Sequence, residues 1–176
     1  MEKSHATTAE DVRYLDDLQP GQRFRSGTQT ITADEIKVFA YEFDPQPFHL
    51  NELAARGSLF GALAASGWHT AALTMRLLVT SLPLAGGIIG RGGEVRWPGP
   101  TRPGDVLRVE AEVVAVTPSR SKADRGTVRF EVRTLNQTIR RAKRCRRPPW
   151  TSSYRDVRPL PDSPGRSERS RSPRSP

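Results

Sequence analysis

A change of hydrophobic period at Pro83 limits how this chain can fold. Before it, apolar residues recur with helical spacing over residues 68–82, in a segment that Ser66 can cap and Pro83 ends. After it, apolar and charged residues alternate over residues 107–113 and 128–132, which is the pattern of half-buried antiparallel strands. One long helix followed by strands predicts an α+β fold, with the helix packed on one face of an antiparallel sheet.

The apolar stripe of the long helix is the main candidate for core packing. We expect it to be buried, as such stripes usually are in globular proteins. Its members are Trp68, Ala71, Ala72, Met75, Leu78, Val79 and Leu82. Two further strands are predicted, at residues 22–30 after a Pro-Gly turn and at residues 86–97 before a Pro-Gly-Pro stop.

A shorter helix is predicted over residues 33–43. Thr32 and Glu35 have the spacing of a capping box, in which each side chain bonds the other residue's backbone N–H. Ile31 and Ile36 have the spacing of the hydrophobic staple that often surrounds such a box. The helix must end before Pro45, because a proline disfavours helical backbone at the residue that precedes it.

The formal net charge of +9 is confined to the end of the chain. Residues 1–137 hold equal numbers of basic and acidic side chains, so the whole excess lies in residues 138–176. That segment is rich in Arg, Ser and Pro, so we predict one folded domain at residues 1–137 and a disordered basic tail at residues 138–176. We do not favour nucleic-acid binding through the tail, because it offers few aromatic side chains for stacking on bases.

The stretch FDPQPFHL places a carboxylate and an imidazole five residues apart, at Asp44 and His49. Two prolines stiffen this segment, which we interpret as a loop. An aspartate before a proline usually just ends a helix, and a single loop histidine usually forms surface hydrogen bonds. The residues themselves therefore leave a structural role and a catalytic role both open.

Three stretches of the chain carry a resemblance to a known family. They are FAYEFDPQPFHLNELAARG, ASGWHTAALTMRLL and GEVRWPGPTRPGDVLRVEAEVV. Together they resemble the MaoC-like dehydratases, also called class 2 enoyl-CoA hydratases, over residues 14–136. The resemblance implies a hot-dog fold, in which an antiparallel sheet wraps around one long central helix. It also implies that Asp44 and His49 are the catalytic pair and that the backbone N–H of Gly67 holds the thioester carbonyl.

The chemistry of that reaction accounts for these residue types. Adding water to C3 of a 2-enoyl thioester requires a group that takes a proton from water and a group that protonates C2. A carboxylate and an imidazole that hold one water between them can do both. Negative charge develops on the thioester oxygen, where the N-terminus of a helix offers free N–H groups. Gly67 permits a close backbone approach at that point.

Two positions depart from the family pattern, because Gln46 stands where Asn is usual and Ser66 where His is frequent. Both side chains keep hydrogen-bonding groups, and we expect both to contribute to substrate binding. The acyl chain of the substrate stays open. We interpret His69 as a structural residue, and we assign Trp97 to packing on the sheet rather than to a platform for a ligand. Arg102 is interpreted as part of a strand-opening turn, with a contact to a CoA phosphate as the alternative.

These features predict a hydro-lyase that interconverts a (3R)-3-hydroxyacyl-CoA and its trans-2-enoyl-CoA, without a metal or other cofactor. A hot-dog thioesterase and an inactive truncated homologue are the alternatives. We expect a homodimer formed through sheet edges and the long helices. A cytoplasmic enzyme of fatty acid metabolism is expected, because the single Cys145 allows no intrachain disulfide and no apolar run is long enough to span a membrane.

The switch to basic residues after Gln137 is abrupt. The resemblance implies a short turn and a final apolar strand there, whereas TIRRAKRCRRPP has Lys or Arg at six of twelve positions. An out-of-frame reading of a GC-rich gene would produce such a switch, and a natural basic extension is the alternative. Translating the neighbouring frame after the Asn136 codon decides between them, because only a frameshift hides an alternating apolar strand there.

Limited proteolysis should remove the tail quickly and leave a folded core that ends near residue 137. The reason is that a segment with so little apolar surface cannot offset the entropy of ordering. Mass spectrometry of the products identifies the cleavage sites. A tail that resists cleavage would show that it packs against the domain.

Overall fold

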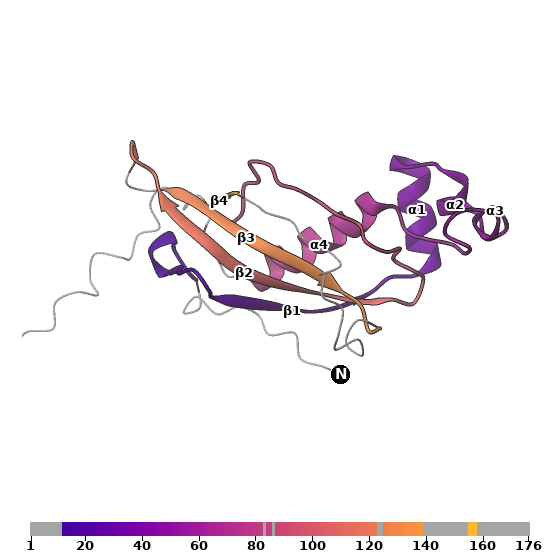
Figure 1. Cartoon of the computed structure of the whole chain (residues 1–176), viewed down its shortest axis with the longest axis horizontal. Coiled ribbons are helices and arrows are strands. Elements are labelled where there is room, and N and C mark those ends of the chain that lie inside the picture. The colour runs from indigo at the N-terminus through magenta and orange to yellow at the C-terminus, as the bar shows by residue number, and fades with distance from the viewer. Residues whose placement is uncertain (1–11, 83, 86, 123–124, 139–154, 158–176) are drawn as a thin grey trace, which may run out of the picture.

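The computed structural model describes residues 12–82, 84–85, 87–122, 125–138 and 155–157. Within these residues, four helices lie between the first strand and the last three strands along the chain (Figure 1). In order, the elements are the short 3-10 helix η2 (Leu15–Asp17), β1 (Arg23–Thr30), α1 (Ala33–Phe43), α2 (Pro47–Leu50), α3 (Glu52–Arg56), α4 (Gly67–Ser81), β2 (Val106–Pro118), β3 (Gly126–Leu135) and β4 (Arg155–Val157).

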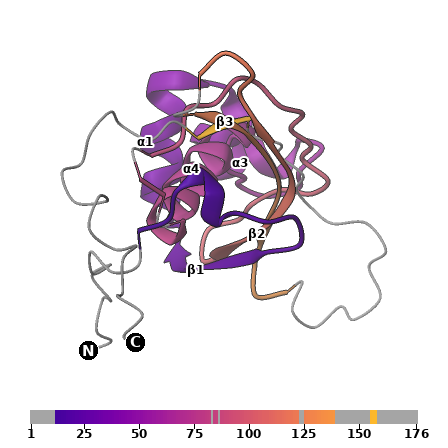
Figure 2. The same cartoon turned by 90° about the vertical axis from the view of Figure 1, so that its left-hand side faces the viewer.

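The strands form one antiparallel sheet in the order β1-β2-β3-β4. The long strands β2 and β3 are strongly curved, and α4 lies in the hollow of the sheet (Figure 2). The short helices α1, α2 and α3 gather at one end of the sheet (Figure 1). The predicted α+β arrangement, an antiparallel sheet around one long helix, is confirmed.

The core lies between α4 and the inner face of the sheet. Alternate residues of β2 and β3 are buried there, as the sequence pattern predicts. They pack with leucines from α4 and the segment after it, and with Leu15 and Leu18 from the first described turn. Phe130 is the largest side chain that is almost fully buried.

The predicted beginning and end of α1 are confirmed. Thr32 accepts from the Glu35 N–H and the Glu35 carboxylate accepts from the Thr32 N–H, which completes the capping box. Ile31 and Ile36 are buried in one cluster, as a hydrophobic staple requires. The helix ends at Phe43, with Asp44 as its C-cap.

The core face of α4 differs from the prediction. The helix has the expected N-cap, Ser66, but only Leu78 and Leu82 of the apolar stripe are buried. Trp68 is 63% exposed and Val79 46% exposed. The buried side instead carries polar residues: two threonines whose hydroxyls have hydrogen-bond partners inside the fold, and a histidine whose ring stacks on Phe39. These residues are His69, Thr70 and Thr74, which lie beside Leu77 and Leu78.

Two hydroxyl pairs join α4 to its surroundings. Thr70 Oγ1 donates to Thr101 Oγ1 over 3.1 Å, and the Thr74 and Thr134 hydroxyls are 2.6 Å apart. A buried hydroxyl without a partner costs about 1 to 3 kcal/mol. A shift of α4 along the sheet would therefore be penalised at two points.

The strand predicted at residues 86–97 is absent from the described part of that segment, residues 87–97. Gly87 and Gly92 have positive φ angles of 76° and 121°, which interrupt an extended backbone. Ile89 is 45% exposed, so the apolar residues of the segment do not form a buried face. A strand there is wrong for this structure, whereas the strand predicted at residues 22–30 is confirmed as β1.

The predicted tail falls mostly outside the described residues. Within residues 138–176 the structure describes Thr138 and the three residues of β4, which pairs with β3. The division of the chain near residue 137 stays a prediction. Among the described residues, no helix has the length and hydropathy that crossing a membrane requires.

Candidate active site

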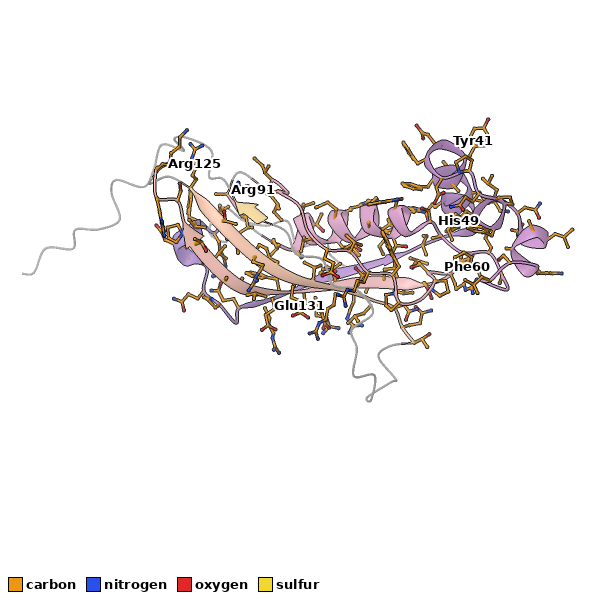
Figure 3. All side chains as sticks on the ribbon, turned by 45° about the horizontal axis from the view of Figure 1, so that its top comes forward. Tyr41, His49, Phe60, Arg91, Arg125 and Glu131 are labelled. Carbon is orange, nitrogen blue, oxygen red and sulfur yellow. The ribbon has the colours of Figure 1, made fainter. Side chains whose placement is uncertain are left out.

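Two short sequence features position Asp44 and His49. Asp44 is the C-cap of α1, where its N–H donates to Ala40 O over 2.9 Å and Pro45 prevents further helix. Pro47 then occupies the first helical position of α2, where a proline is favoured. His49 lies on this single helical turn, so the predicted loop is in part a helix. Figure 3 shows His49 in the cluster of short helices at the end of the sheet.

The hydrogen bonds of His49 define which of its nitrogens is free. Nδ1 lies 2.7 Å from the carbonyl oxygen of Ala64, which can only accept, so Nδ1 carries the proton. In the neutral imidazole, Nε2 is therefore an acceptor. It faces Asp44 Oδ2 at 3.5 Å, and the His49 side chain is only 5% exposed.

Asp44 is held as a carboxylate. Burial raises the pKa of Asp44, but hydrogen bonds from the side chains of Ser66 and Gln46, with the charge of His49, bring that pKa below its ordinary value. The bond from Gln46 Nε2 to Asp44 Oδ1 is 2.7 Å long. When the imidazole is neutral, His49 Nε2 and the Asp44 carboxylate present two acceptors to each other, an arrangement that a shared proton donor would satisfy.

The start of α4 faces the same cavity. Ser66 is fully buried, and its Oγ accepts from the Trp68 N–H. Gly67 is the first helical residue, so its N–H has no acceptor one turn earlier in the helix. A side chain at this position would collide with the Trp97 indole, because an added Cβ would lie 2.8 Å from Trp97 Cε2.

The cavity has a volume of about 650 Å³ and is lined largely by aromatic and small side chains. Phe48 contacts both His49 and Phe60, with ring centroids 4.6 Å and 5.1 Å apart. Trp68 and Trp97 meet edge to face on the other side. All five predicted site residues are at this place: Asp44, Gln46, His49 and Gly67 line the cavity, and Ser66 bonds to Asp44.

A second hollow, of about 300 Å³, lies on the sheet away from this pair. Its charged side chains include ion pairs between neighbours, such as Arg23 with Glu112 at 2.9 Å. Such pairs on a solvated sheet face need no ligand. The hollow is lined by Arg23, Phe24, Arg25, Glu110, Ala111, Glu112, Glu131 and Arg133.

Three features of the site were not predicted. Trp97 lies over Gly67 and its Nε1 donates to the Gly67 carbonyl, so its assignment to sheet packing is wrong. Ala64 contributes only a backbone carbonyl, for which a sequence gives no signal. The guanidinium of Arg102 donates to three backbone carbonyls near the cavity, although the predicted turn at this residue is also present.

His69 is not part of the cavity lining. It is buried, and its ring stacks on Phe39 with centroids 4.5 Å apart. Burial lowers the pKa of His69, which the nearby Glu35 only partly counteracts, so the ring is neutral near pH 7. This environment agrees with the structural role that we expected.

A model of the MaoC like domain matches residues 17–136 of the chain. The chain belongs to this family. A solved MaoC-like dehydratase from Rhodospirillum rubrum is similar, with a TM-score of 0.74, 56% identity, and coverage of 84% of this chain and 99% of that one. The predicted hot-dog fold and the enzyme class, a hydro-lyase of the MaoC-like dehydratases, are thereby confirmed.

Two curated relatives have named activities. The 3-hydroxybutyryl-CoA dehydratase of Methylorubrum extorquens is 30% identical over 64% of this chain and 71% of its own length. The (R)-specific enoyl-CoA hydratase of Rhodospirillum rubrum is 29% identical over 62% of this chain and 75% of its own length. These similarities place the chain in a family of hydratases, and the roles of individual residues in this protein stay predictions.

Substituting Gln46 by leucine should raise the pKa of Asp44. The hydrogen bond from the Gln46 side-chain amide to Asp44 Oδ1 stabilises the carboxylate, and the Gln46 side chain does not cap α2. A ¹³C NMR titration of the Asp44 carboxyl measures the change, with Gln29→Leu on β1 as the control, because the amide of Gln29 bonds the Thr30 carbonyl instead. An unchanged titration in Gln46→Leu would show that this bond does not hold Asp44 ionised.

The lowered pKa of Asp44 makes the stability of the fold depend on pH. Because the folded pKa of Asp44 lies below its ordinary value of 3.8, its ionised form stabilises the fold above that value. This contribution is lost as the pH falls through the folded pKa. Gln46→Leu should therefore reduce the difference in unfolding free energy between pH 6 and acid conditions.

Proposed function

We propose that the protein is a hydratase that interconverts a (3R)-3-hydroxyacyl-CoA and its trans-2-enoyl-CoA. The observation that carries the proposal is that the unprotonated Nε2 of His49 faces the Asp44 carboxylate beside the N-terminus of α4. The relatives named as a 3-hydroxybutyryl-CoA dehydratase and an (R)-specific enoyl-CoA hydratase support the substrate class.

One water molecule can donate one O–H to His49 Nε2 and the other to Asp44 Oδ2. Such a water is oriented with an oxygen lone pair toward the cavity, where C3 of the substrate would lie. The carboxylate also stabilises the imidazolium that forms when Nε2 takes a proton. Pro45 and Pro47 reduce the entropy lost in holding the two groups together.

The proposed hydration proceeds in two steps. The water oxygen bonds to C3, its proton passes to His49 Nε2, and the electrons of the C2–C3 double bond move onto the thioester to form an enolate. The enolate then re-forms its carbonyl while C2 takes the proton from Nε2, which restores His49. Dehydration is the reverse, and neither direction needs a metal or another cofactor.

The enolate oxygen requires a hydrogen-bond donor, and we assign this role to the Gly67 N–H. The first turn of a helix presents such donors at the positive end of its dipole. Ser66 already bonds the Trp68 N–H, and we assign the role to Gly67 because this first helical residue lines the cavity whereas His69 does not. The aromatic side chains of the cavity would surround the acyl chain.

Asp44→Asn and His49→Gln should each lower hydratase activity by about a hundredfold to ten-thousandfold, because each removes one partner of the water. The assay follows loss of the conjugated double bond of crotonyl-CoA, with folding checked by circular dichroism. Wild-type rates in either variant would contradict the assigned roles. Release of free thiol, measured in parallel, would instead support the thioesterase alternative.

Gly67→Pro should be less active than Gly67→Ala by about a hundredfold to a thousandfold, the value of one oxyanion donor. Both changes add a Cβ against Trp97, but only proline removes the N–H. Proline suits this first helical position, and Ser66 already has the extended backbone that a following proline requires, with φ −53° and ψ 141°. Equal rates in the two variants would exclude the Gly67 N–H as the donor.

The collision with Trp97 could mask this difference if Gly67→Ala is itself inactive. The same pair is then compared in a Trp97→Leu background, which gives the added carbon room. A difference between proline and alanine in that background has the same meaning.

We further propose a cytoplasmic homodimer that acts in fatty acid metabolism. Exposed apolar residues on two helices support the dimer: Val38 and Tyr41 on α1, and Trp68 and Val79 on α4. Figure 3 shows Tyr41 directed away from the body of the molecule. A second chain could cover these side chains, which the small sheet leaves in solvent.

Light scattering should give the mass of two chains. Val79→Glu should weaken the dimer, because it places a charge among the exposed apolar residues of α4, whereas Val114→Glu adds the same charge on the sheet. A wild-type protein that is monomeric with a folded core would contradict this proposal.

A further inference from the structure

Arg102 reaches from the turn before β2 to the segment that supports His49. Its Nη1 donates to the carbonyl oxygens of Ala62 and Leu63, the latter over 3.1 Å, and its Nη2 donates to that of Phe60. These carbonyls lie about forty residues away in the chain. One side chain therefore binds most of a short backbone segment.

The bound segment leads directly to the acceptor of His49. Ala64 follows Leu63, and its carbonyl oxygen lies 2.7 Å from His49 Nδ1. The next residue, Ala65, donates its N–H to Thr101 O over 2.9 Å. The Ala64 carbonyl is thus held between two attachments to adjacent residues, Thr101 and Arg102.

The segment has no regular secondary structure that could fix it by itself. Residues 57–66 lie between α3 and α4 as turns and irregular backbone. Leu59 at its beginning is 99% exposed, whereas Leu63 and Ala65 near its end pack in a buried cluster. The hydrogen bonds from Arg102 and the buried cluster therefore act together to fix the direction of the Ala64 carbonyl.

Arg102 is itself anchored to the sheet. Its N–H donates to Asp105 Oδ2 over 2.8 Å, and the other carboxylate oxygen accepts from Gln137, just after β3. The N–H of Gly104 donates to Ile31 O at the end of β1. The turn that holds Arg102 is thereby joined to the ends of two strands.

We propose that Arg102 is a positioning residue for His49, an inference that rests on the proposed function for its effect on catalysis. By holding the segment 60–64, Arg102 keeps the Ala64 carbonyl on Nδ1. The hydrogen bond at one ring nitrogen decides which nitrogen carries the proton, so this contact keeps the unprotonated nitrogen, Nε2, directed at Asp44. Without it, the imidazole can take the other tautomer or rotate away from the carboxylate.

A contact between Arg102 and a CoA phosphate is the competing role, because this cation also lines the cavity. The two roles give different kinetics. A positioning residue affects turnover of any substrate, while a phosphate contact affects only substrates that carry the phosphate. Crotonyl-CoA and the crotonyl thioester of N-acetylcysteamine, which lacks the nucleotide, separate them.

The kinetic test compares Arg102→Gln and Arg102→Lys with Arg120→Gln, an exposed arginine at the far end of β2. Arg102→Gln should lower kcat by about tenfold to a hundredfold with both thioesters, as expected for a displaced catalytic group, with little change in KM. Arg102→Lys should recover part of the loss, because an ammonium can still bond carbonyl oxygens. An unchanged kcat, or a raised KM for crotonyl-CoA alone, would overturn the proposal.

A second measurement is independent of turnover. In protein labelled with ¹⁵N-histidine, the three histidines give separate ring signals, which His5→Gln and His69→Gln assign. His49 should be protonated on Nδ1 in the wild type and should lose this preference in Arg102→Gln. If Arg102→Gln does not fold, Arg102→Lys is used, with a partial loss expected. An unchanged His49 tautomer in a folded Arg102 variant would refute the positioning role, even if the wild type hydrates no thioester. Inactive wild type with the expected tautomer change would refute only the hydratase proposal.

Discussion

The packing of α4 in the hollow of the curved sheet is the interaction on which the rest of the structure depends. Leu78 is completely buried in this contact, and hydroxyl pairs to Thr101 and Thr134 fix the helix along its axis. The first of these pairs holds the N-terminal part of the helix beside the turn that carries Arg102. The N-terminus of α4 and the support of His49 are therefore parts of one connected arrangement.

Local features of the site were predictable because they depend on neighbours in the chain. The capping box of α1, the stop at Asp44 and the N-cap of α4 each involve residues within a few positions of one another. The association of Asp44 and His49 with the start of α4 came from the family resemblance, since nothing local brings residue 67 to residue 49.

Other features could not be predicted, for two physical reasons. Burial on α4 is decided by hydrogen-bond partners that lie elsewhere, so Thr74 is inside while Val79 is exposed. The contacts of Arg102 and Ala64 are made by backbone carbonyls, which every residue type has. The missing strand at residues 87–97 shows a third limit, because side chains that suit a strand were outweighed by glycines with positive φ.

Because α2 is a single helical turn, the number of residues between Asp44 and His49 is itself constrained. Each residue of an α-helix advances the side-chain direction by about 100°, so one residue inserted between Pro47 and His49 would point the imidazole away from both Asp44 and Ala64. A deletion would do the same in the opposite sense. Substitutions at the exposed Pro45 could be absorbed more easily than any insertion or deletion. The number of residues from Asp44 to His49 is therefore as strict a requirement of this site as the two side chains themselves.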